Sequence, residues 1–208
     1  MSDTEIYPES NKVSFLGRGV LKLGAGTQAF AEVLKGQTKT TYVLSPVPTG
    51  VTGLTFSQLS VNLPRPIANV GTVEVRVRAK EAGNRSNEVT SDNQRLVLGV
   101  NGSLGGDWEY SAALSQAVNR SVDRYVNGYF LFNEFASGVA AGTINPFGAS
   151  SAAGQALLQS IRVDDEARKS RGEARGLDGK VTGTLGQLPG GALGVAVGGE
   201  LRRESQQF

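Results

Sequence analysis

Alternation of apolar and polar residues with a period of two is the strongest pattern along this chain. Over residues 177–185 the odd positions are leucine, valine or glycine, whereas the even positions are Asp178, Lys180 and two threonines. The pattern stops at the sequence LPGG and resumes over residues 193–201 with the same parity. Successive side chains of a strand point to opposite faces, so this pattern predicts a hairpin of two long strands with one apolar face.

Two earlier segments repeat this pattern. Even positions over residues 96–104 are leucine, valine or glycine, and after a Gly-Gly-Asp turn Trp108 and Tyr110 begin a similar return strand. The segment near residues 13–34 is less regular, and the sequence does not assign the faces of its return strand. Three hairpins are therefore predicted, at about residues 12–45, 86–119 and 169–206.

Long connections separate the predicted hairpins, at about residues 46–70 and 120–168. Long loops are uncommon in compact soluble domains and usually have a function. The alternating segment 72–80 fits either a strand of its own or the far end of one long strand kinked near Gly83. If all short turns lie on one side, strand parity favours the long kinked strand.

Short turns on one side, long loops on the other and long alternating strands are typical of an outer-membrane β-barrel. We therefore predict an all-β fold, an antiparallel meander of about six long strands that forms part of a transmembrane β-barrel. Trp108 and Tyr110 follow a tight turn, where a lipid-facing aromatic girdle would lie. The charged residues of the strands fall on the opposite parity, as the cost of charge in hydrocarbon requires.

The alternative is a soluble β-sandwich or adhesin-like domain that binds ligand through its long loops. Its strands would also alternate, but sandwich strands usually run about 5–6 residues, and these keep their alternation for longer. A sandwich would bury Trp108, Leu114, Leu185 and Val197 between two sheets. A barrel wall would leave them on an outward apolar surface.

Composition limits the possible chemistry. The 208-residue chain has no Cys and no His, which excludes disulfides, thiolate or imidazole metal sites and histidine-dependent nucleophiles. It contains 28 glycines, as expected for β structure with many turns. Lys and Arg number 21 and Asp and Glu 19, so the net charge of +2 does not predict nucleic-acid binding.

Several other motifs are weak. Residues 24–29, GAGTQA, match a relaxed dinucleotide fingerprint, but no acidic residue lies between Glu32 and Glu74 to bind a ribose. The charged stretch 164–169 is interpreted as a solvated cluster before the next strand rather than a metal site. Residues 1–12 show no signal peptide, and prolines or glycines interrupt both long uncharged stretches, so neither predicts a membrane-spanning helix.

Four sequence segments, in order and spacing, resemble TonB-dependent outer-membrane receptors. They are FAE at residues 30–32, RLVLGVNGSLGGDWEY at residues 95–110, NPFG at residues 145–148 and LPGGALGVAVGGELRRES at residues 188–205. The resemblance covers nearly the whole chain and matches the first half of the barrel in that family. It implies an outer-membrane location and uptake of a scarce nutrient, such as a siderophore or an oligosaccharide, with no catalytic residues and no cofactor.

The resemblance also implies the partners and the ligand-capturing region. Outer-membrane lipid would surround the barrel, and the TonB energy-coupling complex would act through a plug segment. Residues 40–70 and 126–162 would be extracellular loops that contribute to substrate capture. The second long connection, about residues 120–168, holds four aromatic residues that could stack on a ligand or pack against neighbouring loops: Tyr125, Tyr129, Phe130 and Phe132.

The chain departs from the family's full pattern in two respects. Strand-like alternation begins near Lys12, so neither the plug nor the coupling box precedes it. About six strands are predicted, fewer than the eight of the smallest barrels. We therefore expect an internal part of a receptor barrel, which would not transport by itself and whose open edges would favour aggregation.

Overall fold

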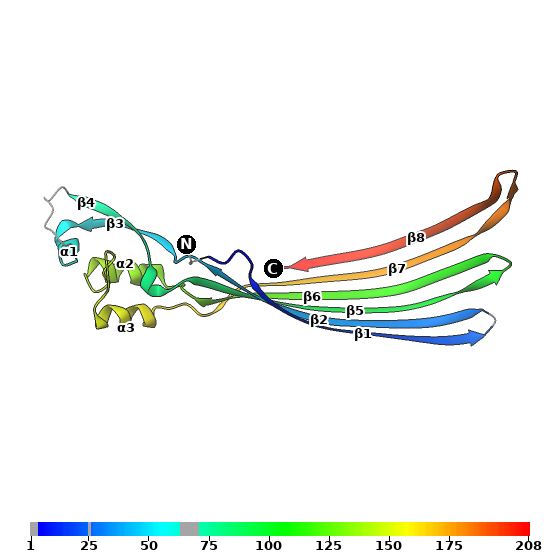
Figure 1. Ribbon diagram of the computed structural model, residues 1–208, viewed down its shortest axis with the longest axis horizontal. Coiled ribbons are helices and arrows are strands. Elements are labelled where there is room, and N and C mark those ends of the chain that lie inside the picture. Colours follow the sequence, from blue (N-terminus) through cyan, green and yellow to red (C-terminus); the bar gives the residue numbers. More distant parts are fainter. Residues whose placement is uncertain (1–3, 25, 63–70) are drawn as a thin grey trace. The chain divides into compact units, whose positions relative to one another are not determined.

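The computed structural model describes residues 4–24, 26–62 and 71–208. The chain divides into two compact units (Figure 1). Unit 1 comprises Met1–Ser10, Thr40–Val89 and Asp123–Ala167. Unit 2 comprises Asn11–Lys39, Thr90–Val122 and Arg168–Phe208.

Six long strands form one antiparallel sheet in the order β1-β2-β5-β6-β7-β8, which confirms the predicted all-β class and the meander of six long strands. Each strand has between 16 and 23 residues. The sheet is open, with β1 and β8 at its edges, and is not closed into a barrel. The strands are β1 (Glu9–Gly24), β2 (Thr27–Leu44), β5 (Arg85–Gly105), β6 (Trp108–Asn127), β7 (Glu166–Leu188) and β8 (Gly191–Gln207).

Tight turns join these strands in pairs, and Figure 1 shows the three hairpin ends at the same, right-hand end of the sheet. Gly105 and Gly106 have φ angles of 108° and 60°, a left-handed backbone that side chains other than glycine disfavour. In the last hairpin the pairing shifts by one residue between Thr184 and Gly186, as at a β-bulge beside the turn.

The segment predicted as the far end of a long kinked strand is instead a strand of its own, so that prediction was wrong. β4 (Thr72–Arg78) pairs with β3 (Pro48–Thr55) in a separate two-stranded antiparallel sheet. A short 3₁₀ turn, η1 (Lys80–Ala82), then separates β4 from β5. The alternation of β4 reflects burial, because Val75 is 7% exposed in the core of unit 1 while Glu74 and Arg76 are exposed.

The connections predicted as long loops also contain regular structure. The first holds β3 and α1 (Phe56–Ser60), with residues 63–70 outside the described part, and the second holds α2 (Phe132–Ala140) and α3 (Ala152–Ser160). Strand β6 continues to Asn127, beyond the predicted end near residue 119. Side-chain caps explain two of the helix starts: Thr55 accepts from the backbone N–H of Gln58, and Ser151 accepts from that of Gly154.

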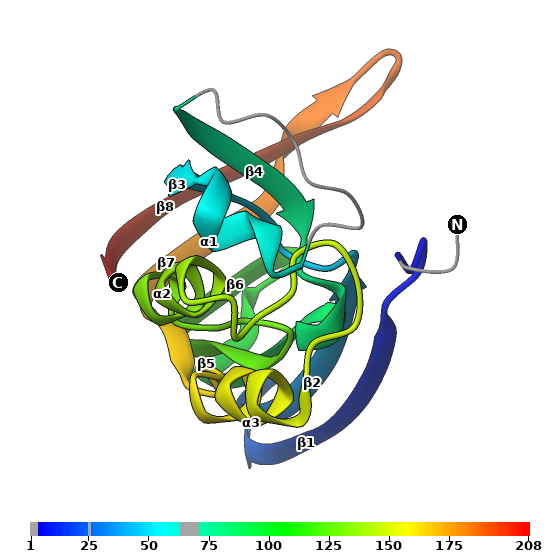
Figure 2. The same cartoon turned by 90° about the vertical axis from the view of Figure 1, so that its left-hand side faces the viewer.

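Unit 1 has its own hydrophobic core. Leu54 and Val139 are 2% and 1% exposed, and Phe135 is 2% exposed. Figure 2 shows the helices of this unit together with β3 and β4. α1 and α2 pack against β3 of the small sheet, and α3 packs against α2 and η1. The buried core residues are Val51, Leu54, Leu59, Val75, Ala79, Phe135, Val139, Ile144, Leu158 and Ile161. Within the described ranges, every helix is too short or too polar to cross a bilayer.

Candidate functional site

The β7–β8 hairpin defines two faces of the long-stranded sheet. Its register places Leu177 opposite Leu201, Val181 opposite Val197 and Gly183 opposite Val195. Directly paired residues of antiparallel strands point to the same side of a sheet. The odd positions of β7 up to Gly183 and the odd positions of β8 therefore form one face, which we call the apolar face.

The neighbouring strands continue the apolar face. A Cβ atom placed on Gly183 would meet the ring of Trp108, and one on Gly179 would contact Cβ of Ala112. Tyr110 Oη lies 3.2 Å from Thr27 Oγ1, and a Cβ on Gly102 would lie 3.0 Å from the same threonine oxygen. These contacts place the even positions of β5 and β6 and the odd positions of β2 on the face of Leu177.

Strand β1 joins the same face, because the side chains of Phe15 and Val33 both approach the position that a Cβ of Gly17 would occupy. Most of the large apolar side chains on this face are exposed, including Leu114 at 58%, Val197 at 69% and Leu201 at 73%. The large side chains of the apolar face are Val13, Phe15, Leu21, Leu23, Val33, Leu96, Leu98, Val100, Leu104, Trp108, Tyr110, Leu114, Leu177, Val181, Leu193, Val195, Val197 and Leu201.

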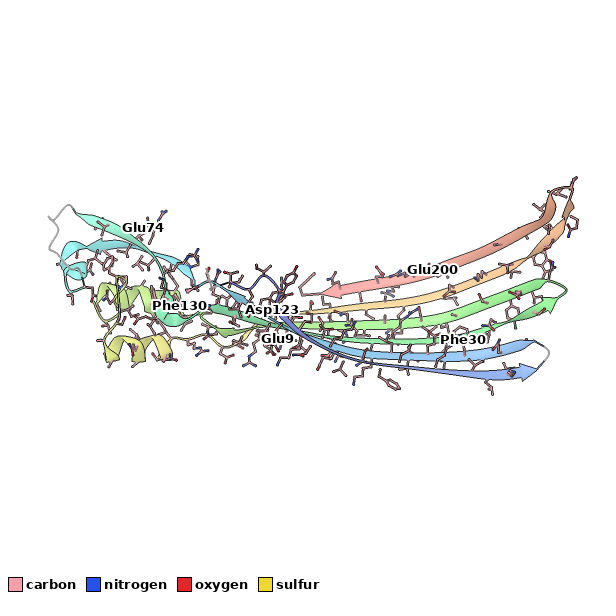
Figure 3. All side chains as sticks on the ribbon, in the orientation of Figure 1. Glu9, Phe30, Glu74, Asp123, Phe130 and Glu200 are labelled. Atoms are coloured by element: carbon pink, nitrogen blue, oxygen red, sulfur yellow. The ribbon has the colours of Figure 1, made fainter. Side chains whose placement is uncertain are left out.

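The opposite face, which we call the polar face, carries the charges of these strand segments. Arg18 Nε lies 3.4 Å from Glu32 Oε1, and its guanidinium lies 5.6 Å from the ring centroid of Phe30. Figure 3 labels Phe30 and Glu200 on this sheet. Apolar side chains also occur here, and Phe30 packs over Gly99. The charged residues are Arg18, Lys22, Glu32, Glu109, Asp178, Lys180 and Glu200.

The apolar face ends at a polar border in every strand, on the side away from the hairpin turns. In β7, for example, Arg175 lies two positions before Leu177. In β8, Arg203 lies two positions after Leu201. In β5 and β8 the apolar stretch spans about nine residues, over 96–104 and 193–201. The border residues are Asn11, Lys35, Gln94, Gln116, Arg175 and Arg203.

The predicted girdle residues, Trp108 and Tyr110, begin β6 and lie on the apolar face next to the turn. Both are half-buried, because Trp108 packs against β7 over Gly183 and Tyr110 reaches Thr27 across β5. Their place beside the turn agrees with the sequence pattern, and their role as a lipid-facing girdle stays a prediction.

The four loop aromatics do not form one cluster. Tyr125 and Tyr129 stack with ring centroids 3.9 Å apart, and Tyr129 Oη donates to Asn87 Oδ1 at 2.7 Å. Burial raises the pKa of the Tyr129 hydroxyl above its ordinary value, because the ionised form would lose hydration. Asn87 in turn donates to Asp123 Oδ1 at 2.9 Å, so this tyrosine pair is held by a polar chain.

Phe130 and Phe132 have different surroundings. Phe130 stacks on Phe135 with centroids 4.6 Å apart and packs against the core of unit 1, whereas Phe132 is 50% exposed (Figure 3 labels Phe130). Sequence reasoning missed Phe135, although Phe135 and Val139 have the spacing of one helix face. Of the four aromatics, only the two tyrosines form a stacked pair with each other.

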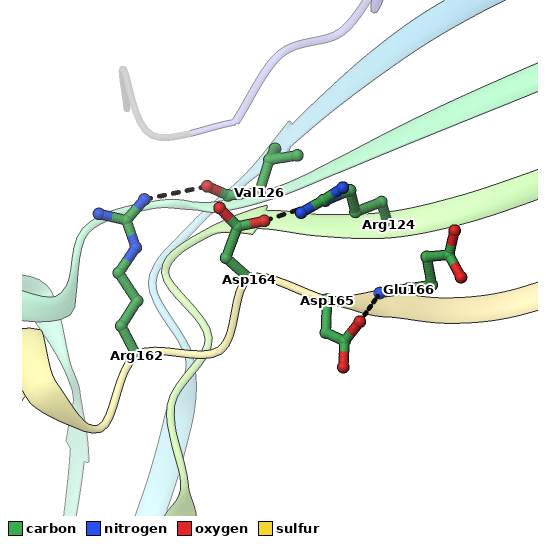
Figure 4. Close-up of polar contacts among 6 residues, drawn as sticks. All are labelled: Arg124, Val126, Arg162, Asp164, Asp165 and Glu166. Atoms are coloured by element: carbon green, nitrogen blue, oxygen red, sulfur yellow. Dashed lines mark hydrogen bonds and ion pairs between the residues drawn. The ribbon is translucent and has the colours of Figure 1, made fainter.

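Figure 4 shows the contacts of the charged stretch 164–169 near its start, together with those of the preceding Arg162. Asp164 Oδ1 lies 3.0 Å from Arg124 Nε, and this contact raises the pKa of Arg124. Arg162 donates to the carbonyl oxygen of Val126 at 2.9 Å, and Asp165 accepts from the backbone N–H of Glu166. No group of three or more possible metal ligands occurs in the described part of the chain.

The dinucleotide-like sequence lies in the first hairpin rather than at a strand-to-helix junction. Gly24 ends β1 and Thr27 begins β2, so no helix N-terminus follows the glycines to hold a pyrophosphate. Ala25 lies outside the described residues. The geometry therefore does not support nucleotide binding at this motif.

The NPFG motif lines a cavity of about 570 Å³ in unit 1, which the sequence pattern did not predict. Within this motif the backbone N–H of Phe147 donates to Asn145 Oδ1 at 2.9 Å in a local turn. Glu81 fixes this loop by accepting from both the backbone N–H and the hydroxyl of Ser150. The cavity wall is mainly apolar, with Phe135, Ile144 and Leu158 from the core.

No protein-family model matches the chain, and comparisons with curated proteins and with solved structures found no match. The resemblance to TonB-dependent receptors stays a prediction from the sequence.

Proposed function

We propose that the long-stranded sheet is part of the lipid-facing wall of an outer-membrane β-barrel, in a receptor of the TonB-dependent type. One observation carries this proposal: the apolar face has no charged residue over its whole apolar stretch in any of the six strands, while the polar face carries charges in the same stretch. A lysine or arginine on the lipid face of such a barrel costs about 2–4 kcal/mol at the bilayer midplane.

The dimensions of the apolar face agree with this proposal. A tilted strand needs about 9–11 residues to cross a bilayer, and the apolar stretches of β5 and β8 span about nine. In water, apolar side chains as exposed as Leu201 and Val197 over a whole sheet would form an unusually large sticky surface. Hydrocarbon around the apolar face removes the unfavourable contact between these side chains and water.

The edges of the sheet set a further requirement. In hydrocarbon, every backbone N–H and C=O group needs a partner within the protein, so β1 and β8 must each pair with another strand. We propose that further strands of the same barrel supply these partners. The polar face would then line the interior, where Arg18, Glu32 and Lys180 meet water or protein.

The uptake role follows from the resemblance and is supported by the placement of the turns. In outer-membrane barrels the short turns are periplasmic and the long connections extracellular. On that orientation, the long connections that follow β2 and β6 are extracellular, and the stacked Tyr125 and Tyr129, near the end of β6, are candidates for ligand contact. The ligand is a scarce nutrient, and energy comes from the TonB complex acting on a plug segment.

Single cysteines test which face meets lipid, because the natural chain has none. Cysteines are placed one at a time from Leu193 to Leu201 in β8 and labelled with an environment-sensitive fluorophore after reconstitution in phosphatidylcholine vesicles. We expect blue-shifted emission, quenched by brominated lipid, at odd positions such as Val197. Even positions such as Ala196 should be quenched by iodide in the water phase.

A result without this period of two would contradict the proposed function. If the chain stays in solution as a cooperatively folded monomer and no position is reached by brominated lipid, the soluble β-sandwich or adhesin-like domain becomes the better explanation. If the labels at odd positions were shielded from both brominated lipid and iodide, a second layer of protein would cover the apolar face, which would also contradict the proposal.

A further inference from the structure

Two arginines face each other at the polar border of the apolar face. Arg175 of β7 and Arg203 of β8 are direct partners in the register, two positions beyond the Leu177–Leu201 pair. They therefore point to the same side as those leucines. Like charges at directly opposed positions of a sheet are unfavourable unless an opposite charge lies between them.

The protein supplies only part of that opposite charge. Glu173 Oε1 lies 2.6 Å from Arg175 Nη2, and Glu173 Oε2 lies 3.6 Å from Arg171 Nη2. Gln116 also donates to Glu173 at 3.1 Å. Arg203, in contrast, makes no side-chain hydrogen bond or ion pair within the described part of the protein.

This group, the arginine patch, consists of Arg171, Arg175 and Arg203 with Glu173, and it is positively charged overall. The side chains of Arg171 and Arg175 are 47% and 68% exposed, so their guanidinium groups are accessible. A guanidinium presents a planar set of donors that fits two oxygens of a phosphate. The patch can therefore accept a phosphate-bearing anion without any rearrangement of its strands.

We propose that the arginine patch binds the phosphate of an anionic lipid headgroup at the border of the bilayer. The proposal rests on the proposed function, because it takes the apolar face as the surface in contact with lipid. On that surface the acyl chains lie along Leu177 and Leu201, and the headgroup of the same lipid lies beside Arg175 and Arg203. A lipid combines both chemistries in one molecule, which a free anion does not.

Vesicle binding of the whole 208-residue chain tests the proposal. Partitioning is measured by co-flotation with vesicles of phosphatidylcholine alone and with vesicles in which one fifth of the lipid is phosphatidylglycerol. Each basic residue near an anionic surface contributes about 1 kcal/mol, a change of about fivefold in the partition coefficient. We therefore expect tighter binding to the anionic vesicles, by about fivefold or more, and a loss of this gain at high salt.

Substitutions separate the patch from general charge. R203Q and R175Q should each remove about fivefold of the preference for anionic vesicles. R202Q is the matched control, because Arg202 is adjacent in β8 but lies on the polar face, where it pairs with Glu204. R202Q changes the net charge equally and should leave the preference close to that of the natural chain.

The outcomes distinguish this inference from the proposed function. Insertion into both kinds of vesicle with equal affinity would overturn the arginine patch as a lipid site and leave the lipid-facing sheet intact. An equal loss of preference in R202Q and R203Q would also overturn it, because net charge alone would then explain binding. Failure to associate with either kind of vesicle would overturn both proposals.

Discussion

Trp108 covers Gly183 on the neighbouring strand so closely that a Cβ atom on Gly183 would lie 2.3 Å from Cδ2 of the indole. The two residues belong to different hairpins, β5–β6 and β7–β8, and lie at the hairpin end of the apolar face. The missing side chain at Gly183 lets the large ring lie flat against the sheet. The contact thus links two hairpins at the level where a girdle residue is expected.

Replacing Gly183 by alanine should disturb this contact. The new methyl group overlaps the indole, so Trp108 must leave its position, and overpacking of this kind costs about 1–3 kcal/mol. Denaturant unfolding in detergent micelles measures the loss, and emission of Trp108, the single tryptophan, reports the displaced ring. Gly199→Ala is the control on the same face, where a Cβ meets nothing within 4 Å. Equal stability of the two variants would contradict the contact.

A charge placed on the apolar face should prevent stable insertion. Val197→Lys puts an ammonium group in the middle of the apolar stretch of β8, at a cost of about 2–4 kcal/mol if lipid covers that face. The neighbouring Ala196→Lys places the same charge on the polar face and should have little effect. Folding yield in lipid vesicles, followed by protease protection, measures the difference. Similar yields for both variants would argue against lipid on the apolar face.

The two phenylalanines of α2 should differ strongly in their contribution to stability. Phe135→Ala removes a ring that is 2% exposed and stacks on Phe130, so we expect a loss of about 3–5 kcal/mol and faster hydrogen exchange in unit 1. Phe132→Ala removes a half-exposed ring and should change stability by less than about 1 kcal/mol. If Phe132→Ala instead lowers ligand uptake in the full receptor, Phe132 would belong to the surface that contacts the ligand.

Tyr129 should make the stability of unit 1 sensitive to alkaline pH. Burial raises the pKa of its hydroxyl in the folded state above the ordinary value near 10.0. The unfolded chain then releases this proton more readily, so the contribution of Tyr129 is complete below about pH 10 and declines as pH rises toward the folded-state pKa. Phenolate absorbance should show a tyrosine that titrates late, and Tyr129→Phe should remove it. A titration unchanged by this substitution would assign the late component to another tyrosine.

Local sequence pattern was sufficient for the long strands, because their side-chain alternation and their glycine turns act over only a few residues. The period of two predicted the six strands and the parity of the apolar face around Leu98 and Val197. It also predicted that Trp108 begins a return strand beside a tight turn, since proximity to a turn is a local property. The same pattern misplaced the segment of β4, because alternation does not identify the partner strand.

Tertiary structure decided which residues meet. The turn of the last hairpin pairs Leu188 with Gly191, a register that would place odd positions of β7 opposite even positions of β8. The irregularity between Thr184 and Gly186 shifts the pairing by one residue, so that Leu177 meets Leu201 and Arg175 meets Arg203. Likewise, packing of α2 assigned Phe130 to a core and left Tyr125 with Tyr129. Sequence determined the faces through backbone geometry, whereas register and packing, which depend on distant residues, determined the contacts on them.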